Sequence, residues 1–304
     1  MRGTAWSRRR ITSISFGRST RFLGALGWPQ RLADHITLAP LVRMRQEFDQ
    51  YACVRPARLL PGVRSPLATP GTIDMVVIRE NSEGEYVTCG GRFKQGQPDE
   101  FAVQTSLHSR KGVERVLRFG FDLARTRRKK LTMITKSNAL KFGMVMWDEV
   151  LEAVRGDYGD VEAERMHVDA AAMDFVRRPA RFDVVVASNL FGDILTDLAG
   201  AIIGGLGLAP SANINPARQY PSMFEPVHGS APDIVGKGIA NPVAAIVSGA
   251  MMLEWLGETD TAAPIFAAVE TALRDGCATA DLGGRLGTAA MTDAVLERMD
   301  HGRS

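Results

Sequence analysis

The chain has 304 residues, of which 45% are hydrophobic and 23% charged, the balance of an ordinary globular protein. That length is enough to bury a large core and favours two lobes over one. The formal net charge is +3, and no basic stripe interleaved with aromatic residues is present, which argues against a nucleic-acid partner. No apolar stretch approaches the length of a transmembrane helix, which argues against a membrane partner.

The N-terminal segment and the cysteines say little about function. The first 33 residues hold seven arginines and no acidic residue. Residues 1–20 have the composition of a transit peptide, but we favour a disordered or non-native segment, followed by a short strand at residues 21–25. Cys53, Cys89 and Cys277 lie too far apart for a metal or redox motif, which indicates thiols in a reducing compartment and a cytoplasmic protein.

Apolar periodicity predicts helices and strands from residue 40 onward. Pro40 suits the first turn of a helix, and apolar residues then recur at steps of three or four up to about residue 52. Arg55 follows in an extended segment. Buried strands are predicted at residues 73–78, 131–135, 165–168 and 182–187. Helices are predicted at residues 111–130, 147–154 and 189–200, with the basic run 125–130 interpreted as a solvated cap of the first.

A later helix is bounded by clear local signals. Asn241 is predicted to cap it, with Pro242 at its first position and Gly257 just past its end. Strands that alternate with helices along the chain predict an α/β fold with a partly parallel sheet.

The stretch Ser188–Gly200, S-N-L-F-G-D-I-L-T-D-L-A-G, follows a predicted strand directly. Asp193 and Asp197 are four residues apart, so a helix places both carboxylates on one face, where they repel each other. A divalent cation converts that repulsion into affinity, because hard cations prefer carboxylate oxygens. The pair also lies just past the C-terminal end of a strand, where α/β proteins collect ligands. Two solvated acids on a surface helix are the alternative, and we favour the metal site.

Other polar residues near the ends of predicted elements suggest an anionic substrate. Arg45, Arg55 and Arg79 together suit a di- or tricarboxylate, because guanidinium groups bind carboxylates in a bidentate manner; a surface ion pair is the alternative for each. Tyr86 and Lys136 each follow a buried strand. A lysine beside guanidinium groups and a metal can act as a base, whereas a rim lysine and a half-buried tyrosine are the alternative.

The loop from Glu225 to Asn241 has the composition of a phosphate-binding loop. It begins E-P-V-H-G-S-A-P-D and contains further glycines, so its backbone N–H groups are available to a phosphate. The carboxylate of Asp233 can accept hydrogen bonds from ribose hydroxyls. No G-x-G-x-x-G fingerprint occurs in the chain, so the composition of this loop alone predicts a nucleotide site only weakly.

Six motifs in a fixed order resemble a known family. They are Arg55-Pro, Arg79-Glu-Asn-Ser-Glu-Gly-Glu-Tyr86, Thr135-Lys-Ser-Asn138, Val168-Asp169-Ala, Asn189-Leu-Phe-Gly-Asp-Ile-Leu-Thr-Asp197 and Glu225-Pro-Val-His-Gly-Ser-Ala-Pro-Asp233. In this order they resemble the metal-dependent β-decarboxylating dehydrogenases, the family of isocitrate, isopropylmalate and tartrate/D-malate dehydrogenases. The match extends from about residue 22 to the C-terminus.

The resemblance implies a substrate and metal site shared between two subunits. Arg45, Arg55 and Arg79 would bind the substrate carboxylates. Lys136 would be the base for the substrate hydroxyl, and Tyr86 would protonate the enol left after loss of CO₂. Asp193 and Asp197 would bind Mg²⁺ or Mn²⁺ together with Asp169, and both Asp169 and Lys136 would come from the partner subunit of a homodimer.

The resemblance also implies a dinucleotide cofactor. Its surroundings would be Asn138, Glu225, His228, Gly229, Ser230, Ala231, Asp233 and Asn241. An acid at Asp233 would repel a 2′-phosphate, which favours NAD over NADP. A monovalent cation such as K⁺ is a further cofactor that the resemblance allows.

Segments at residues 24–29, 34–36, 47–51 and 211–216 resemble the tartrate/D-malate branch of the family. The expected reaction is therefore NAD- and metal-dependent oxidation, with β-decarboxylation, of a D-malate- or tartrate-like 2-hydroxy dicarboxylate. The alternative substrate is 3-isopropylmalate or another 3-alkylmalate.

The implied fold is the two-lobed isocitrate/isopropylmalate dehydrogenase fold. Residues 1–50 and 204–304 would form the larger, cofactor-binding lobe, and residues 51–203 the smaller lobe for substrate and dimerisation. Family members normally begin with a strand, a Gly-Asp-Gly-Ile-Gly-type turn and a helix, which the first twenty residues do not match, so we expect an N-terminally truncated version. A second hypothesis is accordingly a truncated homologue with weak or no activity. A third, a Mg²⁺-dependent phosphoryl-transfer enzyme, leaves Lys136, Tyr86 and the arginines unexplained.

Overall fold

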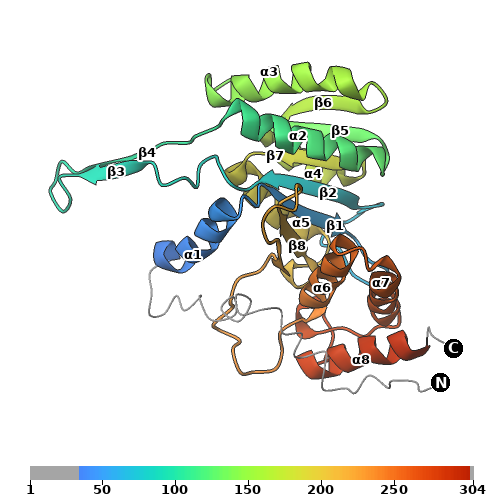
Figure 1. The fold of residues 1–304 in the computed structure, drawn as a ribbon. Coiled ribbons are helices and arrows are strands. Elements are labelled where there is room, and N and C mark those ends of the chain that lie inside the picture. The colour runs from blue at the N-terminus through green and yellow to red at the C-terminus, as the bar shows by residue number, and fades with distance from the viewer. Residues whose placement is uncertain (1–33, 302–304) are drawn as a thin grey trace.

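The structure, a computed structural model, describes residues 34–301, and the predicted strand at residues 21–25 and the branch segment at 24–29 lie outside them. Within that range a seven-stranded sheet has the order β6-β5-β7-β2-β1-β8-β9 (Figure 1). Its strands are β1 (Ala52–Arg58), β2 (Asp74–Glu80), β5 (Lys130–Thr135), β6 (Glu162–His167), β7 (Val184–Ala187), β8 (Pro210–Ile214) and β9 (Met223–Pro226). The pairs from β6 to β2 are parallel and those from β2 to β9 antiparallel. The predicted α/β fold with a partly parallel sheet is confirmed.

Helices cover both faces of the sheet. They are α1 (Asp34–Glu47), α2 (Arg110–Arg125), α3 (Gly143–Arg155), α4 (Val168–Arg177), α5 (Asn189–Ile202), α6 (Val243–Trp255), α7 (Thr259–Arg274) and α8 (Thr288–His301). One core joins α2 and α3 to the sheet. A second core lies on the opposite face and is shared by α4, α5 and the group α6–α8, which Figure 1 shows together near the chain's C-terminus. None of the described helices is long and apolar enough to cross a membrane.

Strand β2 shows why the two cores have the sheet between them. Its side chains alternate, so Met75 and Val77 belong to the core of α4 and α5, while Val76 and Ile78 belong to the core of α2 and α3. A strand that is buried on both faces reads in sequence as a continuous apolar run. That run ends in polar residues, and Arg79 and Glu80 complete the strand.

The first helix differs from its prediction at both ends. It begins at Asp34, so Pro40 lies inside α1 and not in its first turn, although proline has no N–H to donate to the carbonyl one turn before it. It ends at Glu47 and not near residue 52. Asp49 adopts a left-handed φ of 43°, and the N–H of Gln50 donates to the carbonyl of Arg45 at 2.8 Å, the pattern that terminates a helix.

The basic run at residues 125–130 is largely exposed, as predicted, but most of it lies beyond the end of α2. The helix ends at Arg125, and Lys130 already belongs to β5. Part of the run bonds to Asp183, whose carboxylate is fully buried and requires partners. It accepts hydrogen bonds from Arg127 Nε and from the backbone N–H of Arg128, both at 2.8 Å. The start of α6 is one residue later than predicted, with Pro242 as the N-cap, although the N–H of Val243 donates to Asn241 Oδ1 at 3.0 Å; Gly257, with φ of 88°, follows the helix as predicted.

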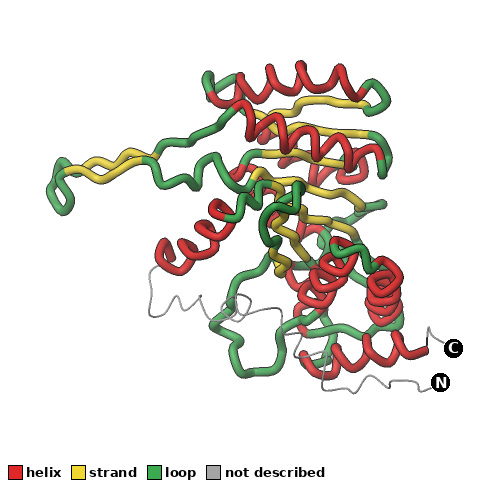
Figure 2. The backbone as a smooth tube through the Cα atoms, in the orientation of Figure 1, coloured by secondary structure: helices red, strands yellow, loops and turns green. Residues whose placement is uncertain are grey.

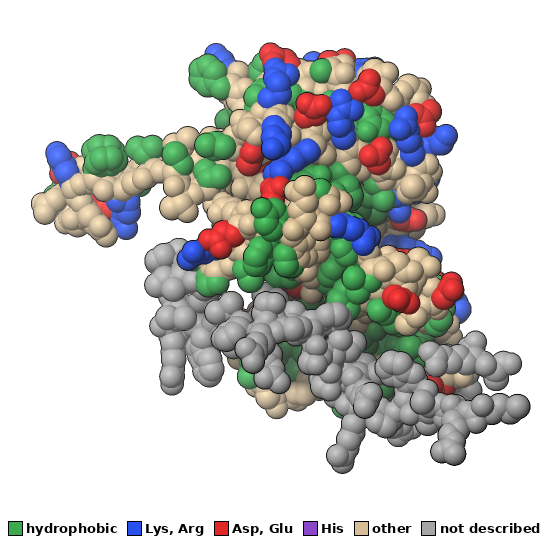
Figure 3. Space-filling view, in the orientation of Figure 1, with side chains coloured by type: hydrophobic (Ala, Val, Ile, Leu, Met, Phe, Trp, Pro, Cys, Tyr) green, Lys and Arg blue, Asp and Glu red, His purple; other side chains and the backbone are tan. Residues whose placement is uncertain are grey.

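A hairpin that was not predicted projects from the body (Figure 2). Strands β3 (Gly90–Phe93) and β4 (Phe101–Gln104) form a separate antiparallel pair, and all their residues are exposed. Phe93 and Phe101 stack with ring centroids 4.8 Å apart, and Figure 3 shows hydrophobic side chains along this arm. A hairpin with apolar exposed side chains cannot be stable through burial within this chain alone.

Candidate active site

The acid pair lies on α5, directly after β7. Asp193 and Asp197 are one helical turn apart, as the spacing required. Between the helix and β2 there is no room for a side chain at Gly192: a Cβ there would lie 2.7 Å from Cβ and 3.2 Å from Cα of Arg79. The missing side chain lets the helix approach the strand closely, and it brings Arg79 beside Asp193.

Asp193 is the centre of the site. Its Oδ1 accepts hydrogen bonds from Arg79 Nη1 and from Arg55 Nη1, the latter at 3.2 Å, and its Oδ2 accepts one from the Tyr86 hydroxyl at 2.7 Å. Burial alone would raise the pKa of Asp193, but the charges of Arg79 and Arg55 and the Tyr86 hydrogen bond outweigh it and lower the pKa. Burial and the adjacent Asp193 raise the pKa of Tyr86 to about 12, so its phenol remains protonated at neutral pH.

Asp197 has the properties of a cation ligand. It is on the exposed side of α5. Partial burial and the nearby charge of Asp193 raise its pKa, so a cation placed beside the two acids would favour the ionised form. Two hard carboxylate oxygens on one helix face fit Mg²⁺ or Mn²⁺. Within residues 34–301 of one chain no third His, Cys, Asp or Glu joins them to complete a metal site.

Two residues that the sequence analysis did not single out hold the arginines. Asn189 Oδ1 accepts hydrogen bonds from Arg79 Nε at 2.9 Å and Nη2 at 2.5 Å. Thr196 Oγ1, between the two acids, accepts one from Arg55 Nη1 at 2.6 Å. Both belong to the quoted motif around the acid pair, but only the fold shows that their partners come from β1 and β2.

Arg45 reaches the same region from α1. It forms an ion pair at 3.1 Å with Glu225 of β9. Its side chain is buried, and its Nε has no hydrogen-bond partner within the described chain. Arg55 Nε is likewise buried without a partner among these residues. Buried guanidinium groups with unused donors fit an additional anion, and the three predicted arginines thus line one polar region.

Lys136 and Asp169 form a second, separate group. Lys136 follows β5, Asp169 is in the first turn of α4, and Lys136 Nζ lies 2.6 Å from Asp169 Oδ1. The hydrogen bond from Lys136 lowers the pKa of Asp169. Asn138 is exposed in the same loop as Lys136 and lines a hollow of about 540 Å³. Asp169 does not join Asp193 and Asp197 within one chain.

Most of the predicted nucleotide residues belong to an open loop after β9. His228 to Asp233 are half-buried or exposed, and a Cβ at Gly229 would meet no atom within 4 Å. Ala231 has a left-handed φ of 43°, a conformation that residues with a side chain rarely adopt. Asn241 Nδ2 donates to Asp281 Oδ2 at 3.1 Å. The free backbone at Gly229 and the accessible carboxylate of Asp233 fit a phosphate- and ribose-bearing ligand.

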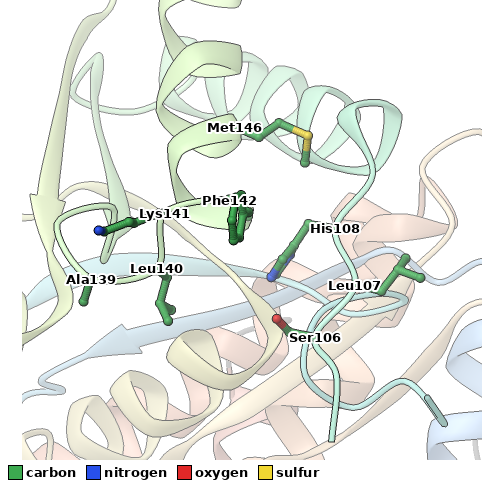
Figure 4. A pocket seen from close by; sticks show the side chains of 9 residues that line it. Ser106, Leu107, His108, Ala139, Leu140, Lys141, Phe142 and Met146 are labelled. Carbon is green, nitrogen blue, oxygen red and sulfur yellow. The ribbon is translucent and has the colours of Figure 1, made fainter. Parts of the chain in front are cut away.

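A larger hollow of about 650 Å³ lies between residues 106–108 and 139–146 (Figure 4). Leu107, Leu140 and Phe142 line it, and Phe142 is 92% exposed. His108 also lines it and is fixed by Trp147, whose Nε1 donates to His108 Nδ1 at 3.2 Å. No predicted site residue lines this hollow.

Comparison with known proteins identifies the chain's relatives. The family model described as isocitrate/isopropylmalate dehydrogenase matches residues 16–295. The chain belongs to this family. The family is one of dehydrogenases, so the predictions of an oxidoreductase and of this fold are confirmed, and the phosphoryl-transfer alternative is set aside.

Individual members of the isocitrate/isopropylmalate dehydrogenase family narrow the resemblance. The chain is 51% identical to a protein named D-malate dehydrogenase (decarboxylating) from Escherichia coli (strain K12), with 91% of this chain and 79% of that protein covered. It is 50% identical to a probable tartrate dehydrogenase/decarboxylase from Bacillus subtilis (strain 168), with 91% and 78% covered. The crystal structure of isocitrate dehydrogenase from Methylococcus capsulatus superimposes with a TM-score of 0.80 at 44% identity, covering 85% of this chain and 76% of that chain. The predicted resemblance to the tartrate/D-malate branch is confirmed.

Proposed function

We propose that this dehydrogenase oxidises and β-decarboxylates a D-malate- or tartrate-like 2-hydroxy dicarboxylate, with NAD and Mg²⁺ or Mn²⁺ as cofactors. The observation that carries the proposal is the region in which Arg55 and Arg79 pair with Asp193 on α5, while the charge of Arg45 also lowers the pKa of that carboxylate. Three buried guanidinium groups supply the charge that two carboxylates of a small diacid require. The names of the relatives support this substrate class.

Each residue of the site has a separate role in this proposal. Arg45, Arg55 and Arg79 bind and orient the diacid. Asp193 and Asp197, with Asp169 contributed by a partner subunit, would hold the divalent cation, which when bound polarises the substrate hydroxyl and the carbonyl that replaces it. Lys136 of the partner subunit accepts the hydroxyl proton. Tyr86, whose phenol is protonated at neutral pH, donates a proton to the enol carbon after CO₂ has left.

A homodimer with shared active sites is supported by the surface of the single chain. Lys136 and Asp169 lie apart from the acid pair, so one chain holds an incomplete set. The faces of α4 and α5 expose Met173, Val176 and Ile194, and the hairpin β3–β4 exposes further apolar side chains. Exposed apolar patches of this kind are typical of surfaces that another subunit covers.

For the cofactor we propose the loop from Glu225 to Asp233 with Asn138 and Asn241. The exposed carboxylate of Asp233 suits ribose hydroxyls and disfavours a 2′-phosphate, which supports NAD.

We also propose that the chain is divided into a cofactor lobe, residues 1–50 and 204–304, and a substrate lobe, residues 51–203. Cys53, Cys89 and Cys277, all within the described residues, are free thiols, which supports a cytoplasmic setting.

The test is a dehydrogenase assay of the 304-residue chain. Soluble protein is incubated with NAD and Mn²⁺ and a panel containing D-malate, tartrate, isocitrate and 3-isopropylmalate, and NADH formation is followed. We expect the highest catalytic efficiency with D-malate or tartrate and loss of activity with excess chelator. A best efficiency with 3-isopropylmalate would select the alternative substrate, and no NADH with any diacid would favour the inactive homologue.

A further inference from the structure

Glu225 connects the substrate arginines to the proposed nucleotide loop. Its Oε1 accepts a hydrogen bond from Arg45 Nη2 at 3.1 Å and another from Asn213 Nδ2 at 2.9 Å. Arg45 and Glu225 are 180 residues apart in sequence. Glu225 is in β9, and the loop with His228 and Asp233 continues directly from that strand. One carboxylate therefore contacts the diacid region and stands at the start of the cofactor loop.

Asn213 fixes that carboxylate. It is fully buried in β8, and while its Nδ2 donates to Glu225, its Oδ1 accepts a hydrogen bond from Asn81 Nδ2 at 2.9 Å. Asn81 also donates to the backbone carbonyl of Gln50 at 3.2 Å. Both ends of the Asn213 amide are thus in use, so a rotation of the amide loses two buried hydrogen bonds at once. The polar chain Asn81–Asn213–Glu225 links the end of β2 to β8 and β9.

Arg45 has donors left for a second anion. Only its Nη2 is paired with Glu225, and its Nε lacks a partner within residues 34–301. A substrate carboxylate on this guanidinium brings a second negative charge close to Glu225. Two carboxylates that share one buried cation repel each other, so the preferred position of Glu225 depends on whether the diacid is bound.

We infer that Glu225 is a positioning residue that makes the affinities for diacid and dinucleotide depend on each other, with Asn213 holding its carboxylate in place. This inference rests on the proposed function. Diacid on Arg45 changes the hydrogen bonds of Glu225, and Glu225 sets the start of the loop that receives the dinucleotide. Such coupling is reciprocal, so either ligand changes the affinity for the other by the same factor.

The test measures binding without turnover. NADH and D-malate cannot react with each other, because NADH cannot accept the hydride of D-malate. In the presence of Mn²⁺, the Kd of NADH is measured by fluorescence without D-malate and with saturating D-malate, and the ratio of the two constants is the coupling factor. We expect a wild-type factor that differs from 1 by about fivefold or more. In Glu225→Gln, which keeps the shape of the side chain and removes its charge, and in Asn213→Asp, we expect a factor within about twofold of 1.

Glu270→Gln is the matched control. Glu270 pairs with Arg58 on the surface at 2.6 Å, so this variant also removes the charge of an Arg–Glu pair, and it is expected to keep the wild-type factor. Because Asn213 is buried, Asn213→Asp counts only if its circular dichroism spectrum matches the wild type. If the spectrum differs, the result of Glu225→Gln alone decides between the outcomes, because the Glu225 side chain is 23% exposed and its replacement is easier to accommodate.

Two results would overturn the inference and leave the proposed function standing: a wild-type Kd for NADH that is independent of D-malate, or a Glu225→Gln variant with the wild-type coupling factor. A wild-type chain that binds no NADH overturns the proposed function itself, and the inference with it.

Discussion

Replacing Gly192 by alanine tests whether the close approach of α5 to β2 builds the site. The new Cβ would lie 2.7 Å from Cβ, 2.8 Å from Cγ and 3.2 Å from Cα of Arg79, so the conflict involves atoms at or next to the backbone and not a flexible tip. Helix and strand must separate by some tenths of an ångström. That separation moves Arg79 away from Asn189 and Asp193, its partners on the helix.

The magnitude follows from three contributions. Alanine improves helix propensity by about 1 kcal/mol. Overpacking costs about 1–3 kcal/mol. A weakened hydrogen bond to the buried Arg79 guanidinium costs about 1.5–3 kcal/mol. We therefore expect Gly192→Ala to lower the free energy of unfolding by about 1.5–5 kcal/mol, measured by urea denaturation, and to raise KM for D-malate about tenfold or more through the displaced Arg79.

Gly200→Ala is the matched control, because Gly200 is on the same helix. Its new Cβ would lie 2.7 Å from Leu206 Cδ2, the end of a side chain that can rotate away. Gly200→Ala should be as stable as the wild type within about 1 kcal/mol, with an unchanged KM for D-malate. If Gly192→Ala matched this control in both stability and KM, the close approach would not be what positions Arg79.

Three more variants test other parts of the account. The raised pKa of Asp197 means that its ionised form destabilises the metal-free fold, an effect that develops as pH rises through that pKa and is complete above it. Asp197→Asn should therefore raise the metal-free Tm at pH 7 and abolish stabilisation by Mn²⁺. If Mn²⁺ still stabilised this variant, the assignment of Asp197 as a ligand would be wrong. Tyr86→Phe should lower kcat for D-malate by about 100-fold with little change in KM, and a kcat within threefold of wild type would contradict its role as proton donor. Replacing Phe93 and Phe101 by serine should shift sedimentation towards monomer; an unchanged dimer would show that the hairpin is not needed for assembly.

Much of the fold could be predicted because its signals are local. The apolar run of β2, the spacing of α5, and the Asn241 and Gly257 boundaries of α6 all depend on neighbouring residues and their backbone preferences. The same holds for the acid pair, since a four-residue step on a helix places two side chains together whatever surrounds them. Arg45, Arg55 and Arg79 needed the ordered family motifs, because each alone reads as a surface ion pair.

What the sequence did not show depends on contacts between distant segments. The residues just after α2 bond to the buried carboxylate of Asp183, more than fifty residues later in the chain. The hairpin β3–β4 buries no face of its own, so its sequence has no alternation of apolar and polar residues from which the strands could be predicted. The pairing of Glu225 with Arg45 and Asn213 changed the interpretation of a residue that had been assigned to the cofactor alone. Such partners become visible only when the sheet order is known.

The shared metal site is the central claim, and mixing two inactive variants tests it most directly. Asp197→Asn lacks a ligand of the acid pair, and Asp169→Asn lacks the ligand assigned to the other subunit. When the two are unfolded together and refolded as a mixture, each hybrid dimer should contain one intact site and one doubly altered site. With random pairing, the mixture should recover about a quarter of the wild-type D-malate activity, although each variant alone has almost none. Recovery of no activity from a mixture shown to contain hybrid dimers would contradict a metal site built from two subunits.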